Sequence, residues 1–190
     1  MHKDGIRQPV TRDVKHPELF SAPSELSCEN EVKGLLVALT YLLKPDIVLE
    51  VGVAEGFTAQ AIGSELAHNG VGHLHALDIN LSQIPAEIRD ALAPLPVSLH
   101  EINFMAYEPP GIIDLAFLDA TLDQKDDEVL HFRPWFRKGT ILVLHNMGYG
   151  RGGDMKYPKR AEGAFGRVPA GLYRRIHLPS PAGVAVVEWL

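Results

Sequence analysis

The chain has 190 residues, 46% of them hydrophobic, and a formal net charge of −6. This length fits one domain with a sizeable core, and the negative charge argues against nucleic-acid binding, which needs clustered Lys and Arg. The single cysteine, Cys28, excludes an internal disulfide framework and a Cys-rich zinc site.

The beginning of the chain shows no targeting pattern. Residues 1–24 are polar and contain prolines, so we expect an arm or a short cap ahead of a domain at residues 25–190. The chain does not begin with the apolar run of a signal peptide, and no stretch reaches about 18 consecutive apolar residues. We therefore expect a cytoplasmic protein that binds neither nucleic acid nor membranes.

Helical and strand patterns alternate along most of the chain. Apolar residues recur at helical spacing from Asn30 to Leu43, and Pro45 ends that helix. The apolar run IVLEV follows as a strand, and a second helix begins after Gly56. Further strands are expected at 73–77, 97–102, 114–118 and 140–144, and further helices at 84–92 and 124–132. This alternation predicts a parallel sheet with helices on both faces.

The C-terminal end has a different pattern. Two strands, at 172–178 and 183–190, are joined by a short turn that contains proline. They must pair antiparallel, because a parallel crossover needs about a dozen or more residues. The predicted fold is therefore α/β, with a doubly wound, mostly parallel seven-stranded sheet that ends in an antiparallel hairpin.

The segment EVGVAEG, directly after the first predicted strand, is a candidate ligand-binding loop, because open α/β sheets bind ligands beyond the carboxyl ends of their strands. Gly52 and Gly56 allow the backbone to approach a ligand closely, and the next helix begins with free N–H groups. The glycine fingerprints of dinucleotide-binding and phosphate-binding loops are absent. Glu50 would repel a pyrophosphate and suits an ammonium or sulfonium group. An ordinary glycine-rich turn is the alternative.

Asp78 stands at the end of the second predicted strand. A carboxylate in this place can accept hydrogen bonds from both hydroxyls of a ribose. Taken alone, Asp78 fits a turn or a helix cap equally well. Together with Glu50 and the two glycines, the ribose interpretation is favoured.

The segments VLEVGVAEGFTAQAI, LHALDIN, IDLAFLDA and RKGTILVLHNM together resemble class I S-adenosylmethionine-dependent methyltransferases. Within that class, the chain most resembles the catechol O-methyltransferase-like branch, from about Leu26 to Met147. The terminal hairpin also matches the class. The resemblance implies a Rossmann-like methyltransferase fold and an enzyme that transfers the methyl group of S-adenosylmethionine to an oxygen of a small molecule.

The resemblance also implies which residues contact the methionine portion of the cofactor. Gly52 and Gly56 would line it, Glu50 would lie near its amino group, and Thr58 would touch its carboxylate. Ser27 would lie near the segment that covers the cofactor.

The remaining cofactor contacts follow from the same resemblance. Asp78 would hold the ribose, and Asn103 and Phe104 would frame the adenine. Asp119, at the end of the strand DLAFL, would lie against both the cofactor and the acceptor.

In the catechol-type enzymes, the positions of Asp119, His145 and Asn146 hold a divalent metal that binds two substrate oxygens and lowers the pKa of the attacking hydroxyl. Here His-Asn replaces the family's Asp-Asn pair. The loss of one carboxylate moves the expectation from Mg²⁺ toward Mn²⁺, Zn²⁺ or Fe²⁺, or toward no metal at all. Without a metal, His145 would be the general base, because its ordinary pKa is close to neutral.

A second departure concerns the catalytic lysine of the family, whose position is occupied by Leu122. Asp123 and Lys125 are the nearest ionisable groups. This departure leaves open an S-adenosylmethionine-binding protein without turnover, besides an N-methyltransferase or an enzyme that acts on a protein or sugar hydroxyl.

Several further features bear on partners. The segment 148–167 is rich in glycine and basic residues, which fits either an anionic acceptor or a solvated loop. The short N-terminal arm suggests that another subunit of a homo-oligomer contributes to the acceptor site. His73, His75, His100 and His131 show no ligand spacing among themselves and are assigned no role.

Overall fold

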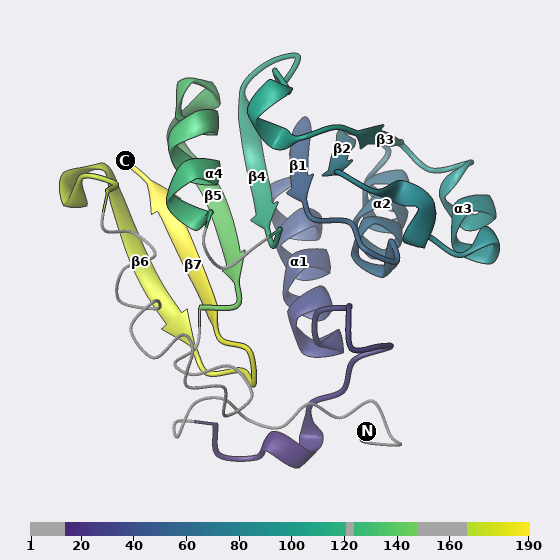
Figure 1. Ribbon diagram of the computed structural model, residues 1–190. Helices are drawn as coiled ribbons and strands as arrows, with labels where there is room; N and C mark the ends of the chain where they lie inside the picture. The colour runs from purple at the N-terminus through teal and green to yellow at the C-terminus, as the bar shows by residue number, and fades with distance from the viewer. Residues whose placement is uncertain (1–13, 121–123, 148–166) are drawn as a thin grey trace.

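The computed structural model describes residues 14–120, 124–147 and 167–190. Its centre is a seven-stranded sheet in the order β3-β2-β1-β4-β5-β7-β6 (Figure 1). The strands are β1 (Ile47–Val51), β2 (His73–Asp78), β3 (Val97–Glu101), β4 (Ile113–Leu118), β5 (Phe136–His145), β6 (Tyr173–Leu178) and β7 (Val184–Trp189). Strands β1 to β5 run parallel, and β7 pairs antiparallel with both β5 and β6. The predicted fold and its terminal hairpin are therefore confirmed.

Four α-helices belong to the described part of the chain: α1 (Asn30–Leu43), α2 (Phe57–Asn69), α3 (Ala86–Leu92) and α4 (Lys125–Phe132). Short 3-10 turns are η1 (Pro17–Leu19), η2 (Leu81–Gln83), η3 (Phe104–Ala106), η4 (Arg133–Trp135) and η6 (Ala170–Leu172). None of the helices that the structure describes combines the length and the apolar character needed to cross a bilayer.

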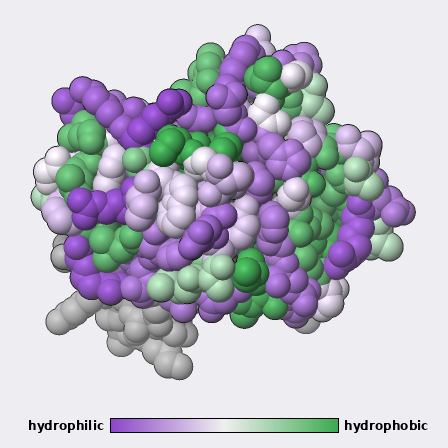
Figure 2. All heavy atoms as spheres, turned by 90° about the horizontal axis from the view of Figure 1, so that it is seen from above, coloured by the Kyte–Doolittle hydropathy of each residue, from purple (hydrophilic) through white to green (hydrophobic). Residues whose placement is uncertain are grey.

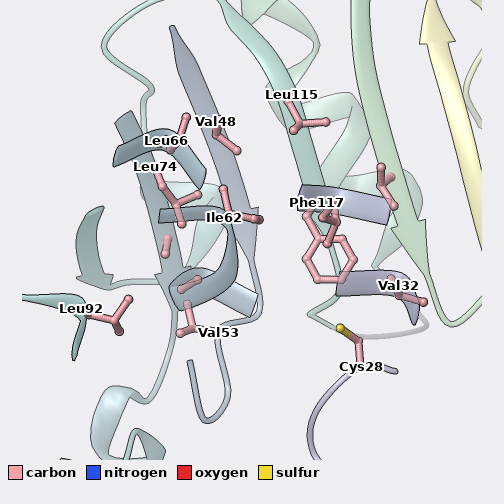
Figure 3. Packing of buried hydrophobic residues seen from close by; sticks show 14 of the residues in the cluster. Cys28, Val32, Val48, Val53, Ile62, Leu66, Leu74, Leu92, Leu115 and Phe117 are labelled. Carbon is pink, nitrogen blue, oxygen red and sulfur yellow. The ribbon is translucent and has the colours of Figure 1, made fainter. Parts of the chain in front are cut away.

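The two faces of the sheet bury two separate hydrophobic clusters, because alternate residues of a strand point to opposite sides. Val48 of β1 packs with Ile62 of α2 on one face, where Phe117 lies near Val32 and Cys28 (Figure 3). Leu49 of β1 packs on the other face, in the cluster that contains α4. Helices therefore cover both faces, as the sequence predicts.

The register of the three central strands places the loops that form the site. Val51 of β1 pairs with Leu118 of β4, and Leu118 pairs with Leu144 of β5. The residues that follow these strands therefore leave the sheet side by side, at the lower edge in Figure 1, where the chain before α1 also lies. The opposite end, viewed from above in Figure 2, is a mosaic of hydrophilic and hydrophobic residues.

Candidate active site

A cavity of about 540 Å³ lies at the carboxyl ends of the parallel strands. Its size falls within the range of about 300–1,000 Å³ that small-molecule sites usually have. Most of the predicted site residues line it: Gly52, Asp78, Asn103, Phe104, Asp119, His145 and Asn146. Glu50, Gly56 and Thr58 do not line it. Glu25 and Leu26, which directly precede Ser27, contribute a further part of the wall.

The loop after β1 is held close to the end of β4. Gly52 has a φ of 93°, and a Cβ atom added there would lie 2.8 Å from the carbonyl oxygen of Asp119 and from the backbone nitrogen of Ala120. The sequence analysis expects a ligand to approach the backbone at Gly52 closely. In the structure, the backbone of Asp119 and Ala120 lies against Gly52. A larger side chain at this position would displace the end of β4 as well as fill the cavity.

Asp78 ties the same loop to β2. Its Oδ2 accepts hydrogen bonds from the backbone N–H groups of Val53, at 2.8 Å, and Ala54, at 3.0 Å. Its Oδ1 accepts a third hydrogen bond, from the N–H of Asn80 at 3.0 Å. Asp78 is thus the turn-organising residue of the loop and also faces the cavity. Its role toward a ribose stays a prediction.

Asn103 and Phe104 form the wall beyond β3. The Asn103 side chain accepts a hydrogen bond from the N–H of Met105 at 2.9 Å and so caps η3. Phe104 is buried and packs with Phe132 of α4, with ring centroids 6.2 Å apart. Both residues line the cavity, and their role toward an adenine stays a prediction.

Glu50 is fully buried behind the loop, and neither of its carboxylate oxygens has a hydrogen-bond partner among the described residues. Burial raises the pKa of Glu50 well above its ordinary value, and the nearby carboxylates of Asp119 and Asp78 raise it further. Buried polar groups almost always have partners, so an unpartnered carboxyl group suggests a group that is still to be bound. A cation is the ligand that this position would stabilise most.

His145 lies between two carboxylates. Its Nδ1 lies 2.9 Å from Oδ2 of Asp119, and its Nε2 lies 2.6 Å from Oε2 of Glu29, the residue that precedes α1. Asn146, at a φ of 63°, donates its side-chain N–H to Oδ1 of Asp119. The structure therefore brings Asp119, His145 and Asn146 together. It also adds Glu29, which the sequence analysis did not identify.

The charges in this cluster follow from its geometry. Burial raises the pKa of Glu29, but the hydrogen bond and charge of His145 outweigh that effect and lower it to about 2. Burial lowers the pKa of His145, but Asp119 and Glu29 outweigh burial, and the pKa is raised above its ordinary value. An imidazolium that donates to two carboxylates satisfies all these contacts.

In this arrangement, the predicted metal ligands do not fit a divalent ion. Both ring nitrogens of His145 already face carboxylate oxygens, so neither offers a lone pair to a metal. Asp119 supplies one carboxylate, and each of its oxygens lies against a neighbouring side chain. Metal binding would require His145 to give up one of its partners. The metal assignment stays a prediction, and the proposals below do not depend on it.

Two other predicted residues lie outside the cavity wall. The hydroxyl of Thr58 lies 3.3 Å from the sulfur of Cys28, whose pKa is raised to about 12 by burial, so Cys28 is a packed residue. Lys125 is buried at the start of α4, where it donates to the carbonyl of Leu118 at 2.7 Å and pairs with Glu128 at 3.4 Å. Lys125 therefore does not act on the cavity from this position.

Some predictions fall on residues that the structure does not describe. Leu122 and Asp123 lie outside the described ranges, as does the basic segment up to residue 166. At its described end, Arg167 donates to Asp127 at 2.7 Å and, through its backbone, to Asp126 at 3.3 Å. Arg167 is thus paired with the acidic start of α4.

A sequence model of a family described as a methyltransferase domain matches residues 49–147, which include the loop after β1 and the end of β5. The chain belongs to this methyltransferase family. No curated protein matches the sequence of this methyltransferase significantly.

Solved structures of other methyltransferases share its fold. The O-methyltransferase TomG from Streptomyces achromogenes, involved in tomaymycin synthesis and in complex with SAM, has a TM-score of 0.66 and 18% identity over 87% of this chain and 82% of that chain. The O-methyltransferase from Bacillus cereus, in complex with SAH, has a TM-score of 0.67 and 15% identity over 88% of this chain and 84% of that chain. The SAH-bound methyltransferase PaMTH1 from Podospora anserina has a TM-score of 0.65 and 19% identity over 84% of this chain and 78% of that chain.

These comparisons confirm the class I methyltransferase that the sequence resembles, and with it the prediction of an enzyme. At such low identities, the structural likeness shows the shared fold and assigns no role to an individual residue.

Proposed function

We propose that this methyltransferase binds S-adenosylmethionine in the cavity and methylates an oxygen atom of a small molecule. The observation that carries the proposal is the fully buried, unpartnered carboxyl group of Glu50 beside the loop after β1. Such a group is costly unless a ligand satisfies it, and the ammonium group of the cofactor's methionine portion would do so. The relatives with SAM or SAH in their structures support this choice of cofactor.

The other side chains of the cavity fit the remaining parts of the cofactor. Asp78 would accept a hydrogen bond from a ribose hydroxyl with the one lone pair that its three backbone contacts leave available. Asn103 and Phe104 would border the adenine. The Thr58 hydroxyl lies 3.3 Å from the sulfur of Cys28. Like Glu50, Thr58 does not line the cavity, so both residues would reach the cofactor only after a rearrangement of the loop after β1.

On the acceptor side, we assign the proton-accepting role to Asp119. Its side chain is 14% exposed, whereas that of His145 is 1% exposed, so Asp119 is the group that an acceptor can touch. His145 and Asn146 donate to the two oxygens of Asp119 and fix its orientation. Bound S-adenosylmethionine would supply the methyl group from its sulfonium. The protein would position the acceptor hydroxyl and receive its proton on Asp119.

The alternative in which His145 itself is the base has less support from the geometry. A proton acceptor needs a free lone pair, and both nitrogens of His145 face carboxylates. His145 is better described as the positioning residue for Asp119. Among the described residues that line the cavity, none favours a nitrogen acceptor over an oxygen acceptor.

The proposal can be tested with two measurements on the full-length protein. Calorimetry with S-adenosylhomocysteine measures cofactor binding. Mass spectrometry then measures S-adenosylhomocysteine formation from S-adenosylmethionine in the presence of phenols, hydroxy acids and amines. Binding together with product that depends on a hydroxyl acceptor supports the proposal. Absence of binding contradicts it, and binding without product from any acceptor indicates a cofactor-binding protein without turnover.

A further inference from the structure

Lys125 and Glu128 form an ion pair in the first turns of α4, with Nζ and Oε2 3.4 Å apart. The exposed fractions of the two side chains are 1% and 0%, so the pair has almost no contact with solvent. Lysine and glutamate are rarely buried this completely. Neither residue lines the cavity, so the pair is separate from the groups that would touch the cofactor or the acceptor.

The stability of α4 does not explain a buried ion pair. Taking two charges out of water costs free energy that their attraction often fails to offset, and hydrophobic residues of similar volume frequently give equal or greater stability. The helix is already anchored by Val129 and Phe132, which are both completely buried. The pair is better explained by a contact that a charged donor makes and a hydrophobic residue cannot make.

Lys125 makes such a contact with the end of β4. Its Nζ donates a hydrogen bond to the carbonyl oxygen of Leu118 at 2.7 Å. The same peptide group carries the N–H of Asp119, which donates to the carbonyl oxygen of Val51 in β1 at 2.8 Å. Both polar atoms of this peptide group are thus held, one by α4 and the other by β1. Because a peptide group is planar, the two contacts fix its orientation and the point from which the Asp119 side chain extends.

Glu128 keeps the charged end of Lys125 at this peptide group. Lysine carries its charge on a flexible four-carbon stem, so a fixed counter-charge is needed to hold it in one direction. Burial raises the pKa of Glu128, and the charge of Lys125 acts against that rise. The charge of Asp119 raises the same pKa further, so Glu128 lies within electrostatic reach of Asp119. The ion pair therefore belongs to the surroundings of Asp119 as well as to α4.

We propose that Lys125, oriented by Glu128, is a positioning residue for methyl transfer, because it fixes the peptide group that precedes Asp119. This inference rests on the proposed function, in which Asp119 accepts the proton of the acceptor hydroxyl. His145 and Asn146 hold the two carboxylate oxygens, whereas Lys125 holds the backbone that carries them. A displacement of about 1 Å in a catalytic site can lower the rate about a hundredfold, even when the altered residue is remote from the chemistry.

The test uses the full-length double variant Lys125→Met/Glu128→Met. It removes both charges together and leaves no unpaired buried charge, so the fold should be retained. The matched control is Asp127→Asn, which removes a charge from the same turn of α4, but from a side chain that is 42% exposed. Chemical denaturation measures the stability of each protein.

The first readout is amide hydrogen exchange, resolved at individual residues by nuclear magnetic resonance. In the double variant, the N–H of Asp119 should exchange about tenfold faster or more, since its peptide group loses the charged partner of the carbonyl oxygen. Asp127→Asn should leave this rate unchanged. Exchange at Asp119 that is as slow in the folded double variant as in the wild type would overturn the proposal, whether or not an acceptor is known.

The second readout separates kcat from KM, with a hydroxyl acceptor that gives product in the wild type. In the double variant, kcat should fall by about tenfold to a hundredfold, while KM for S-adenosylmethionine should stay within about twofold. A loss that is only structural would not fall on kcat alone. Faster exchange with an unchanged kcat would overturn the proposal. Absence of product in the wild type would contradict the proposed function instead, and the exchange rate alone would then decide whether Lys125 orients Asp119.

A single variant, Lys125→Met, keeps the test decisive if the double variant does not fold. Burial already raises the pKa of Glu128, so this carboxyl group can stay neutral when its partner is lost. Lys125→Met should show the same faster exchange at Asp119 and the same fall in kcat. Wild-type values of both quantities in Lys125→Met would overturn the proposal.

Discussion

Glu29 and His145 form a buried ion pair, 2.6 Å apart, although 116 positions separate them in the sequence. Both side chains are almost completely inaccessible to solvent. The second oxygen of Glu29 accepts a hydrogen bond from the backbone N–H of Ala182, at 2.9 Å. One carboxylate thus connects the start of α1, the end of β5 and the turn before β7.

Replacement of Glu29 should destabilise the protein strongly. Glu29→Gln keeps the shape of the side chain but leaves the imidazolium of His145 without one of its two charged partners. Breaking a buried pair in this way costs about 3–5 kcal/mol. Chemical denaturation would measure the loss. Glu31→Gln, an exposed acid two residues further along, should change the free energy of unfolding by less than about 0.5 kcal/mol. If the two substitutions lowered the free energy of unfolding equally, the buried ion pair between Glu29 and His145 would be contradicted.

The same pair predicts how stability depends on pH. Glu29 has a pKa lowered from 4.5 to about 2, so its contribution is present above pH 4.5 and is lost as the pH falls toward 2. His145 has a pKa raised from 6.5, so its contribution is present below pH 6.5 and is lost as the pH rises through the raised value. The free energy of unfolding should therefore be highest between these limits. In Glu29→Gln, the free energy of unfolding should fall less steeply as the pH decreases from 4.5 toward 2. An unchanged pH dependence in this range would be inconsistent with the lowered pKa of Glu29.

Cofactor binding should release a proton from Glu50. Burial keeps the raised pKa of this group above its ordinary 4.5, and an ammonium group placed beside it would lower that pKa and ionise the carboxyl group. Affinity for S-adenosylhomocysteine should then increase with pH between 4.5 and the raised pKa. Calorimetry in two buffers of different ionisation enthalpy would detect the proton. Glu50→Gln should abolish the release and weaken binding, and a proton that is still released by this variant would assign it to another group.

Asp78 should contribute to affinity in two ways. Asp78→Ala removes the proposed ribose contact and also three hydrogen bonds that hold the loop after β1. We expect a loss of about 1.5–3 kcal/mol in S-adenosylhomocysteine binding, the range for leaving polar partners unpaired. Asp78→Asn keeps one acceptor oxygen for the loop and should lose less. Calorimetry that shows unchanged affinity in Asp78→Ala would reject the ribose assignment.

Methyl transfer should be insensitive to chelators, because the two nitrogens of His145 are held by Glu29 and Asp119. Product formation should be the same with ethylenediaminetetraacetic acid as with added Mg²⁺ or Mn²⁺, while His145→Ala should reduce it. A different result, in which the chelator abolishes activity and a metal restores it, would show that His145 changes partners to bind an ion.

Much of the fold could be predicted because its signals are local. Helical spacing marks α1, compact apolar runs mark β1 and β4, and a short proline-containing turn requires the final hairpin. The boundaries shift by a few residues: β5 begins at Phe136, four residues before the predicted strand. Phe136 is buried, but the next three residues, 137–139, are exposed, so they interrupt the apolar pattern that marks a buried strand.

The site could be predicted only in part, since partners from distant segments leave no local pattern. Asp119, His145 and Asn146 follow predicted strands, and adjacency of β4 and β5 brings them together. Glu29 stands before a helix, where acidic residues are common, and nothing in its neighbours indicates that it is buried.

The span of chain between Glu29 and His145 has a consequence for biosynthesis. At about 5–20 residues per second, a ribosome would need on the order of ten seconds to pass from one residue to the other. Until β5 emerges, the carboxylate of Glu29 has no counter-charge and must stay hydrated, so the start of α1 cannot take its final buried position. The complete set of Glu29 contacts can therefore form only after β5 and the turn before β7 have left the ribosome.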